Sequence, residues 1–294
     1  MRRRPAPAEF ARSNLPHALA WEAQTNGGAA AAVAAHEFWY HTIDVAPGVT
    51  TPGWFDLRPV VDHMPWPDLT GKRCLEVGPY DGFLSFEMER RGAAEVVAAD
   101  IGSPWEWDWP VRSRESGPRA VAAMSGERTG EGFRIAAGIL GSRAKRVEIS
   151  AYDLSTDNVG EFDFVVCGSL MLHLRDPVRA MEAIRGVCRG SFLSAETVSI
   201  GLRSVFRRPA ARLRGGDRCQ WWIPNPAGHA LMVEAAGFRI ERAVRPYAIP
   251  LGPAHPARRT RLRASPEHWF AAPVTRGLGV PHAALLARPE APGS

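Results

Sequence analysis

The chain has 294 residues, 45% of them apolar, and a formal net charge of +5 at pH 7. That length is enough for one large α/β domain with additions or for two small domains. No apolar run approaches the ~20 residues that a membrane-spanning helix needs, and no apolar stretch follows the basic N-terminus, so we expect a cytoplasmic protein without a secretory signal. Only Lys72 and Lys145 among the 36 basic residues are lysines. The positive charge therefore permits RNA or an acidic partner without implying either.

The first 66 residues are predicted to form an N-terminal extension of a domain that spans residues 67–294. Alanines at 29–35 favour a helix. Residues 38–66 then combine turn-forming residues with many aromatic side chains, among them Tyr40, which His41 follows. Such a segment usually packs on a domain as a cover, so we predict an aromatic lid. Plain packing and substrate contact are both open for each of its aromatic residues.

The most informative part of the sequence runs from Arg73 to Asp100. It has the pattern of a strand, a glycine turn, a helix and a second strand. Apolar residues at helical spacing follow Gly82, and a run of Val and Ala leads into Asp100 at the carboxyl edge of the second strand. Gly78 and Gly82 allow a tight turn and would leave open space for a ligand at the helix N-terminus. The carboxylate of Asp100 could accept hydrogen bonds from both hydroxyls of a ribose.

The turn Gly-Pro-Tyr-Asp-Gly bears on the choice of nucleotide cofactor. A dinucleotide fold uses G-x-G-x-x-G so that backbone amides can approach a pyrophosphate, whereas Pro79 removes one amide here. The pattern E-x-G-x-x-x-G, which begins at Glu76, resembles motif I of the class I methyltransferases, and the distal Asp100 resembles its partner acid. These enzymes bind S-adenosylmethionine. The resemblance implies a set of cofactor-binding residues around the turn and the next strand end: Glu76, Gly78, Pro79, Tyr80, Gly82, Asp100 and Ile101.

Three tryptophans alternate with other residues after this unit, at Trp105, Trp107 and Trp109. The period of two fits a half-buried strand, while on a loop the same residues could form a wall over the adenine or the substrate entrance. Plain packing is the third interpretation. A helix is predicted within residues 117–141.

A short strand at residues 146–151 leads into Tyr152 and Asp153. In the fold of the resembled enzymes this position faces the adenine ring, whose amino group could donate to the carboxylate. Asp153 could instead cap a short helix at residues 155–159. We favour a cofactor role for Asp153, with Tyr152 beside it.

Residues 162–170 form a nearly continuous apolar run, which predicts a central strand buried on both faces. Gly168 near its end is assigned to the cofactor site. His173 follows the strand, beside the place where the transferred methyl group would lie. Its imidazole could accept a proton from a substrate hydroxyl or ring nitrogen, or it could hydrogen-bond the backbone and shape the loop.

A fifth strand is predicted at residues 191–197, and strands at 238–244 and 283–287 complete a seven-stranded sheet. An insertion at about 198–224 follows the fifth strand. It is usual for such a basic segment to be a solvated face, but this one is also the best candidate for a polyanion contact. The arginines of the insertion are Arg203, Arg207, Arg208, Arg212, Arg214 and Arg218.

The four cysteines are scattered along the chain. Cys74 and Cys167 lie in predicted buried strands, and Cys188 and Cys219 lie elsewhere. No Cys/His cluster has the spacing of a zinc site. We therefore expect reduced core thiols and no metal.

Residues 38–237 are similar, more specifically, to the family that includes the tRNA wobble-uridine 5-oxyacetate carboxymethyltransferases. Five motifs carry the similarity: HTID at 41–44, TPGWFD at 51–56, DLTGK at 68–72, LHLRDP at 172–177 and WWIPNPAGHALMVEAAGF at 221–238. The resemblance implies that members using carboxylated S-adenosylmethionine hold the extra carboxylate with a tyrosine before the turn histidine and an arginine on the last strand. Here Leu172 and His282 take those places. Because an uncompensated carboxylate in a closed site costs several kcal/mol, we predict the ordinary cofactor.

We therefore predict an α/β, Rossmann-like sheet of seven mostly parallel strands with an N-terminal lid and an insertion after strand 5. The predicted function is transfer of a methyl group from S-adenosylmethionine to an O or N nucleophile of a small molecule, with a tRNA base as the alternative. His173 is the first choice for the proton acceptor, and Tyr40 and His41 are weaker candidates. A catalytically silent binding protein is the alternative of another class, and Pro79 disfavours a nicotinamide oxidoreductase.

Overall fold

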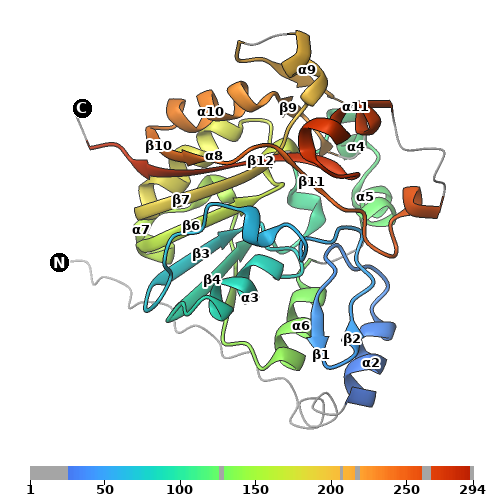
Figure 1. Ribbon diagram of the computed structural model, residues 1–294. Helices are drawn as coiled ribbons and strands as arrows, with labels where there is room; N and C mark the ends of the chain where they lie inside the picture. Colours follow the sequence, from blue (N-terminus) through green and yellow to red (C-terminus); the bar gives the residue numbers. More distant parts are fainter. Residues whose placement is uncertain (1–25, 126–128, 206–207, 216–218, 260–265, 292–294) are drawn as a thin grey trace.

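A computed structural model describes residues 26–125, 129–205, 208–215, 219–259 and 266–291. In these residues one large sheet forms the centre, with helices on both sides (Figure 1). Strands β3 to β7 run parallel, whereas β12 is antiparallel to each of the three strands that pair with it. The order across the sheet is β10 (Phe238–Ala243), β12 (Val280–Pro289), β7 (Cys188–Thr197), β6 (Phe162–Gly168), β3 (Arg73–Val77), β4 (Glu95–Asp100) and β5 (Lys145–Glu148), and β11 (Tyr247–Ile249) pairs with the start of β12.

This arrangement confirms the predicted fold class, a mostly parallel α/β sheet, and adds β11 to the seven strands expected. Ten α-helices lie within the described ranges. They are α2 (Asn26–Ala35), α3 (Phe83–Arg90), α4 (Val111–Glu115), α5 (Pro118–Ser125), α6 (Glu131–Leu140), α7 (Thr156–Val159), α8 (Pro177–Val187), α9 (Ile200–Val205), α10 (Pro226–Ala235) and α11 (Pro266–Thr275).

Alternation along the strands divides the core into two layers. In β6, Phe164 and Val166 belong to the cluster that packs with α3, whereas Val165 and Cys167 belong to the cluster that packs with α8. Successive side chains of a strand point to opposite faces, so a strand covered on both faces needs apolar residues at every position. This explains the continuous apolar run of β6. Cys74 and Cys167 lie in buried strands, as predicted, and the side chains of Cys188 and Cys219 are buried too.

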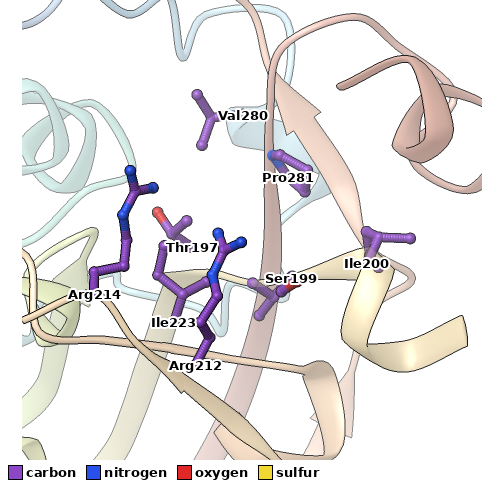
Figure 2. A pocket seen from close by; sticks show the side chains of 10 residues that line it. Thr197, Ser199, Ile200, Arg212, Arg214, Ile223, Val280 and Pro281 are labelled. Carbon is purple, nitrogen blue, oxygen red and sulfur yellow. The ribbon is translucent and has the colours of Figure 1, made fainter. Parts of the chain in front are cut away.

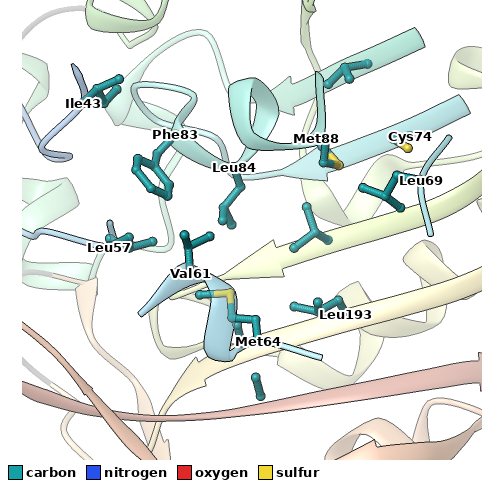
Figure 3. Close-up of a cluster of buried hydrophobic side chains, with 14 of the residues drawn as sticks. Ile43, Leu57, Val61, Met64, Leu69, Cys74, Phe83, Leu84, Met88 and Leu193 are labelled. Carbon is teal, nitrogen blue, oxygen red and sulfur yellow. The ribbon is translucent and has the colours of Figure 1, made fainter. Parts of the chain in front are cut away.

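The N-terminal segment contributes to the core on the α3 side of the sheet. It carries the hairpin β1 (Asp44–Ala46) and β2 (Val49–Thr50) and a short 3₁₀ helix at Val61–His63. Figure 3 shows its apolar side chains beside those of α3 and the sheet. Trp39 is 2% exposed, and its indole Nε1 donates to the carbonyl of Val33 at 3.0 Å. The N-terminal segment is therefore part of the hydrophobic core on this face of the sheet.

The tryptophan segment does not form the half-buried strand that its period allowed. Pro104–Glu106 is a 3₁₀ helix whose N-cap, Ser103, accepts from the backbone of Trp105. Prolines at both ends of the segment fix φ and remove donors that a sheet ladder would need. Trp109 is buried, with its Nε1 bonded to the carbonyl of Pro104 at 2.7 Å, while Trp105 is 36% exposed.

The insertion after β7 is folded over the described part of its length. It contains the antiparallel pair β8 (Ala211–Leu213) and β9 (Trp222–Pro224). Arg207 and Arg218 lie outside the described residues. In the ranges that the structure describes, no helix is long and apolar enough to cross a membrane.

Candidate cofactor and acceptor site

Three acidic side chains meet where β3 ends. Glu76 lies on β3, Asp81 lies in the turn that follows, and Asp100 ends the neighbouring strand β4. Glu76 and Asp81 are almost fully buried. Burial raises the pKa of all three carboxyls, and the charge of Asp100 raises those of Glu76 and Asp81 further. The carboxyl edge of the sheet therefore concentrates negative charge at one turn.

Asp100 faces this turn from the end of β4. Its Oδ1 accepts from the backbone N–H of Ile101 at 2.9 Å. Burial raises the pKa of Asp100 to about 6, while the guanidinium of Arg146 and backbone N–H groups, including that of Tyr80, act in the opposite direction. The carboxylate has about four lone-pair sites, so the N–H groups of Ile101 and Tyr80 use only part of its capacity.

Glu76 is tied to the helix that follows the turn. The hydroxyl of Ser85 on α3 donates to its Oε2 at 2.5 Å. Burial raises the pKa of Glu76 to about 7, although the bonds to Ser85 act against this rise. The contact fixes the carboxyl between strand and helix.

Asp81 is a site residue that the sequence analysis missed. Its Oδ2 accepts from the backbone N–H groups of Tyr40 at 2.6 Å and His41 at 2.9 Å. Burial raises its pKa to about 7. Asp81 therefore anchors the N-terminal segment to the glycine turn. Within the turn motif an aspartate is an ordinary turn residue, and its partners lie 40 and 41 residues earlier.

Two residues other than glycine adopt the left-handed backbone conformation at this edge. Tyr80, in the turn after β3, has φ of 50°, and Ser169, directly after Gly168 and β6, has φ of 54°. This conformation is costly for residues other than Gly, Asn and Asp. Residues that adopt it are frequent at functional sites. Both residues lie at strand ends where a ligand of this fold would bind.

The glycines of the turn are required by packing inside the protein, which corrects the expectation of open space beside them. Gly82 has φ of 87°, and a Cβ there would lie 2.5 Å from the ring of Phe133 and 2.9 Å from that of Phe86. A Cβ on Gly78 would come within 3.0 Å of the Leu170 side chain. Aromatic and apolar side chains therefore occupy the space over both glycines.

Gly82→Ala should destabilise the protein more than the same change at a glycine with free space. We expect the free energy of unfolding to fall by about 2 kcal/mol, from the positive φ and from overpacking against Phe133 together. Gly48→Ala is the matched control, because Gly48 has φ of 75° and a Cβ added there would meet no atom within 4 Å. It should cost about 1 kcal/mol. Urea unfolding of both variants measures the difference, and equal losses would show that Phe133 does not restrict this position.

His173 lies in a short 3₁₀ helix, Met171–His173, just beyond β6. Its Nδ1 donates to the backbone carbonyl of Cys219 at 3.0 Å, so the loop-shaping contact considered from the sequence is present. Burial lowers the pKa of His173. Because a carbonyl can only accept, Nδ1 carries the hydrogen and Nε2 keeps its lone pair. The ring is held in the tautomer that a proton acceptor at Nε2 requires.

Two substitutions separate the base role of His173 from its loop contact. Asparagine can keep a donor close to the position of Nδ1 but has no counterpart of Nε2. If Nε2 is the base, His173→Ala and His173→Asn should both lower kcat about 100-fold and leave the affinity for S-adenosylhomocysteine unchanged. Steady-state kinetics and calorimetry measure the two effects. Retained kcat in His173→Asn would assign the residue to the loop contact alone.

Tyr40 and His41 have different surroundings in the lid. The ring of Tyr40 lies 5.1 Å from that of Tyr80, and burial together with the charges of Glu196 and Asp81 raises the pKa of its hydroxyl. His41 is 8% exposed, and burial lowers its pKa to about 3. Its Nδ1 has no hydrogen-bond partner in the described residues. Both side chains are therefore neutral near pH 7.

Tyr152 and Asp153 lie in a 3₁₀ helix, Ala151–Asp153, just beyond β5. The hydroxyl of Tyr152 donates to Oδ2 of Asp108 at 2.6 Å, and it accepts from the backbone of Asp176 at 3.2 Å. Asp153 is exposed. It does not cap the short helix α7, because Ser155 forms the capping box there. The capping interpretation of Asp153 was therefore wrong.

Asp108 connects three segments and was also missed from the sequence. Its Oδ2, which accepts from Tyr152, also accepts from the backbone N–H of Arg175 at 2.8 Å. Its backbone carbonyl accepts from the indole Nε1 of Trp221 at 2.8 Å. The guanidinium of Arg175 lies 4.7 Å from the centre of the Trp221 ring. The tryptophan segment, the turn that follows β6 and the insertion are thereby joined above the carboxyl edge of the sheet.

A second buried polar group lies at the ends of β6, β7 and β12. Glu196 accepts from the backbone of Met171 at 3.1 Å, and burial raises its pKa to about 8. His282 donates from Nδ1 to the carbonyl of Val280 at 2.9 Å. Its Nε2 lies 2.7 Å from the Ser169 hydroxyl and 3.1 Å from that of Thr197. Burial lowers the pKa of His282 to about 4, so this ring is neutral and both of its nitrogens are engaged.

No known protein-family description matches the chain, and no curated protein matches its sequence. Within the described residues, no group of three or more His, Cys, Asp or Glu side chains is arranged to hold a metal ion.

Solved structures similar to this chain include several methyltransferases. The 1,6-didemethyltoxoflavin-N1-methyltransferase of Burkholderia thailandensis is 14% identical, with a TM-score of 0.45 over 76% of this chain and 72% of that one. An S-adenosylmethionine-dependent methyltransferase of Mesorhizobium loti is 16% identical, with a TM-score of 0.45 over 79% and 97%. The magnesium protoporphyrin IX methyltransferase of Synechocystis is 13% identical, with a TM-score of 0.44 over 76% of both chains. At such identities the reaction has to be inferred from the residues of the chain itself.

Proposed function

We propose that the chain is an S-adenosylmethionine-dependent methyltransferase acting on an O or N nucleophile of a small molecule. One observation carries the proposal: Glu76, Asp81 and Asp100 converge at the turn after β3. Burial raises the pKa of all three carboxyls, and repulsion from Asp100 raises those of Glu76 and Asp81 further. A cationic ligand relieves such repulsion, whereas an anionic one increases it. S-adenosylmethionine carries a sulfonium and an ammonium group. A dinucleotide would bring a pyrophosphate to the same turn, where Pro79 offers no amide.

The residues at the two strand ends fit this cofactor. Asp100 has acceptor capacity beyond its bond to Ile101 and would hold the ribose. Glu76 and the turn from Gly78 to Gly82 would lie along the methionine end. At the adenine end the exposed carboxylate of Asp153 is the better candidate, because the hydroxyl of Tyr152 already bonds Asp108.

The bound cofactor would supply an activated methyl group, and the protein would supply position and a proton acceptor. Alignment of the acceptor is the main contribution expected for an in-line displacement. The engaged Nδ1 of His173 supports Nε2 as the atom that takes the acceptor's proton. Asp81 would keep the lid closed over the reacting groups through its bonds to Tyr40 and His41.

Calorimetry with S-adenosylhomocysteine tests the proposal directly. We expect S-adenosylhomocysteine to bind and NAD to show no binding under the same conditions. Transfer of a radioactive methyl group to a pool of small acceptors then tests the reaction. Absence of binding would contradict the proposal, and binding without transfer to any acceptor would favour a catalytically silent protein that keeps the fold.

The ordinary cofactor is favoured over its carboxylated form by the state of His282. This residue takes the place of the cation that the resembled tRNA-modifying enzymes are expected to use, yet it is neutral and its nitrogens are bonded to neighbouring groups. Leu172 takes the other place and is buried. In competition calorimetry we expect S-adenosylmethionine to displace the carboxylated form. The reverse preference would restore the tRNA wobble-uridine assignment.

A further inference from the structure

A pocket lies between the end of β7, the start of β12 and the hairpin of the insertion. Its cavity volume is about 90 Å³, which limits an occupant to a small molecule or to the end of a larger one. Thr197 lies at the sheet side, and Ile223, Val280 and Pro281 supply apolar walls. The hairpin supplies two cations, Arg212 and Arg214.

The two arginines direct their charged groups into the same space. Figure 2 shows both side chains rising from the hairpin toward the level of Thr197, and both residues line the pocket. Arg212 is half-buried and Arg214 is exposed. Guanidinium groups bind carboxylates through paired N–H donors, and two of them beside apolar walls suit an anionic group attached to an apolar body.

The pocket is connected to the candidate reaction site by short contacts. The hydroxyl of Thr197 lies 3.1 Å from Nε2 of His282, which also contacts Ser169 at the end of β6. The hairpin makes a second connection through the backbone. The N–H of Arg214 donates to the carbonyl of Trp221 at 2.8 Å, and the N–H of Trp221 donates to the carbonyl of Leu172 at 2.7 Å. The arginine-bearing hairpin is therefore fixed to the short helix that carries His173.

We infer that this pocket is the acceptor subsite and that it takes a small carboxylic acid, whose carboxylate pairs with Arg212 and Arg214 while its apolar body lies against Ile223, Val280 and Pro281. The inference rests on the proposed methyltransferase function and names its substrate class. The acid would enter from the side of β7 and β12, and the cofactor would lie at the ends of β3 and β4. His173 stands on the turn between these two halves.

Matched probes test the subsite without knowledge of the natural acceptor. Benzoate and benzamide have nearly the same shape and differ in charge. NMR titration of the protein, with and without S-adenosylhomocysteine, should show benzoate binding at least tenfold more tightly than benzamide, because only benzoate forms charge-assisted bonds. The variant Arg212→Gln/Arg214→Gln should lose this difference. Arg239→Gln, an exposed arginine on β10, is the control and should bind benzoate like the wild type.

The outcomes separate the subsite from the proposed function. Equal binding of benzoate and benzamide, or unchanged benzoate binding in the double variant, would overturn the subsite. If inorganic phosphate bound the pocket as tightly as benzoate, the assignment of a carboxylic acid as the substrate would be overturned, because the apolar walls would then contribute nothing to binding. Binding of S-adenosylhomocysteine by every variant shows that each is folded. If benzoate binds and S-adenosylhomocysteine does not, the acid site is supported and the methyltransferase function is contradicted.

Discussion

Replacing Asp100 by asparagine is expected to weaken binding of S-adenosylhomocysteine about 100-fold, while the protein stays folded. Asparagine keeps an oxygen for the N–H of Ile101 but loses the charge and half of the acceptor oxygens that a ribose would use. A hydrogen bond to a charged group contributes about 1.5–3 kcal/mol, and about 1.4 kcal/mol corresponds to a factor of ten. Calorimetry of wild type and variant at pH 7.5 measures the ratio.

The pH dependence adds a second readout to this experiment. The pKa of Asp100 is raised to about 6, so its carboxyl is protonated at pH 5 and charged at pH 7.5. Affinity should therefore fall as the pH is lowered through 6, and less steeply in Asp100→Asn. Asp157→Asn is the control, because Asp157 is an exposed aspartate on α7 outside the proposed cofactor site. This variant should bind S-adenosylhomocysteine like the wild type at each pH, since an exposed group is screened by solvent. Wild-type affinity in Asp100→Asn would remove Asp100 from the cofactor site.

The fold could be predicted because it depends on patterns that are local in the sequence. The apolar run of β6 reflects burial on both faces, and the acid at position 100 closes a strand in which the four preceding residues are Val or Ala. The pattern of the tryptophan segment left a strand, a loop wall and plain packing open, because a period of two is also produced by chance in a proline-bounded turn. Local pattern thus located the strand ends but not the conformation of the loops between them.

The parts of the site that the sequence did not predict depend on contacts between distant segments. Asp81 is placed by Tyr40 and His41, and Asp108 by Arg175 and Trp221. No spacing rule connects such residues, because the sheet brings them together only after folding. For the same reason the packing of Phe133 over the glycine turn could not be foreseen, and open space was expected there.

Glu196→Gln should make the ligand-free protein more stable at pH 8 and flatten the pH dependence of its stability. Glu196 is 2% exposed, and burial raises its pKa from 4.5 to about 8. Between these values the folded protein holds a proton that the unfolded chain has released. The folded state therefore binds more protons, and wild-type stability falls as the pH rises from about 4.5 to 8 and is level above that range.

The expected size of this effect follows from one proton. Each bound proton that differs between the two states changes the free energy of unfolding by about 1.4 kcal/mol per pH unit. Glutamine cannot ionise and still offers an oxygen to the N–H of Met171. In Glu196→Gln the free energy of unfolding should therefore depend less on pH, by up to this slope. At pH 8 it should be several kcal/mol higher than that of the wild type. Urea unfolding at pH 5, 6, 7 and 8 measures both curves, with the exposed Glu182→Gln as a control that should follow wild type. If the free energy of unfolding of Glu196→Gln changed with pH as that of the wild type does, Glu196 would have to be ionised in the folded protein across this range. Its surroundings at the ends of β6 and β7 would then have to supply a compensating cation.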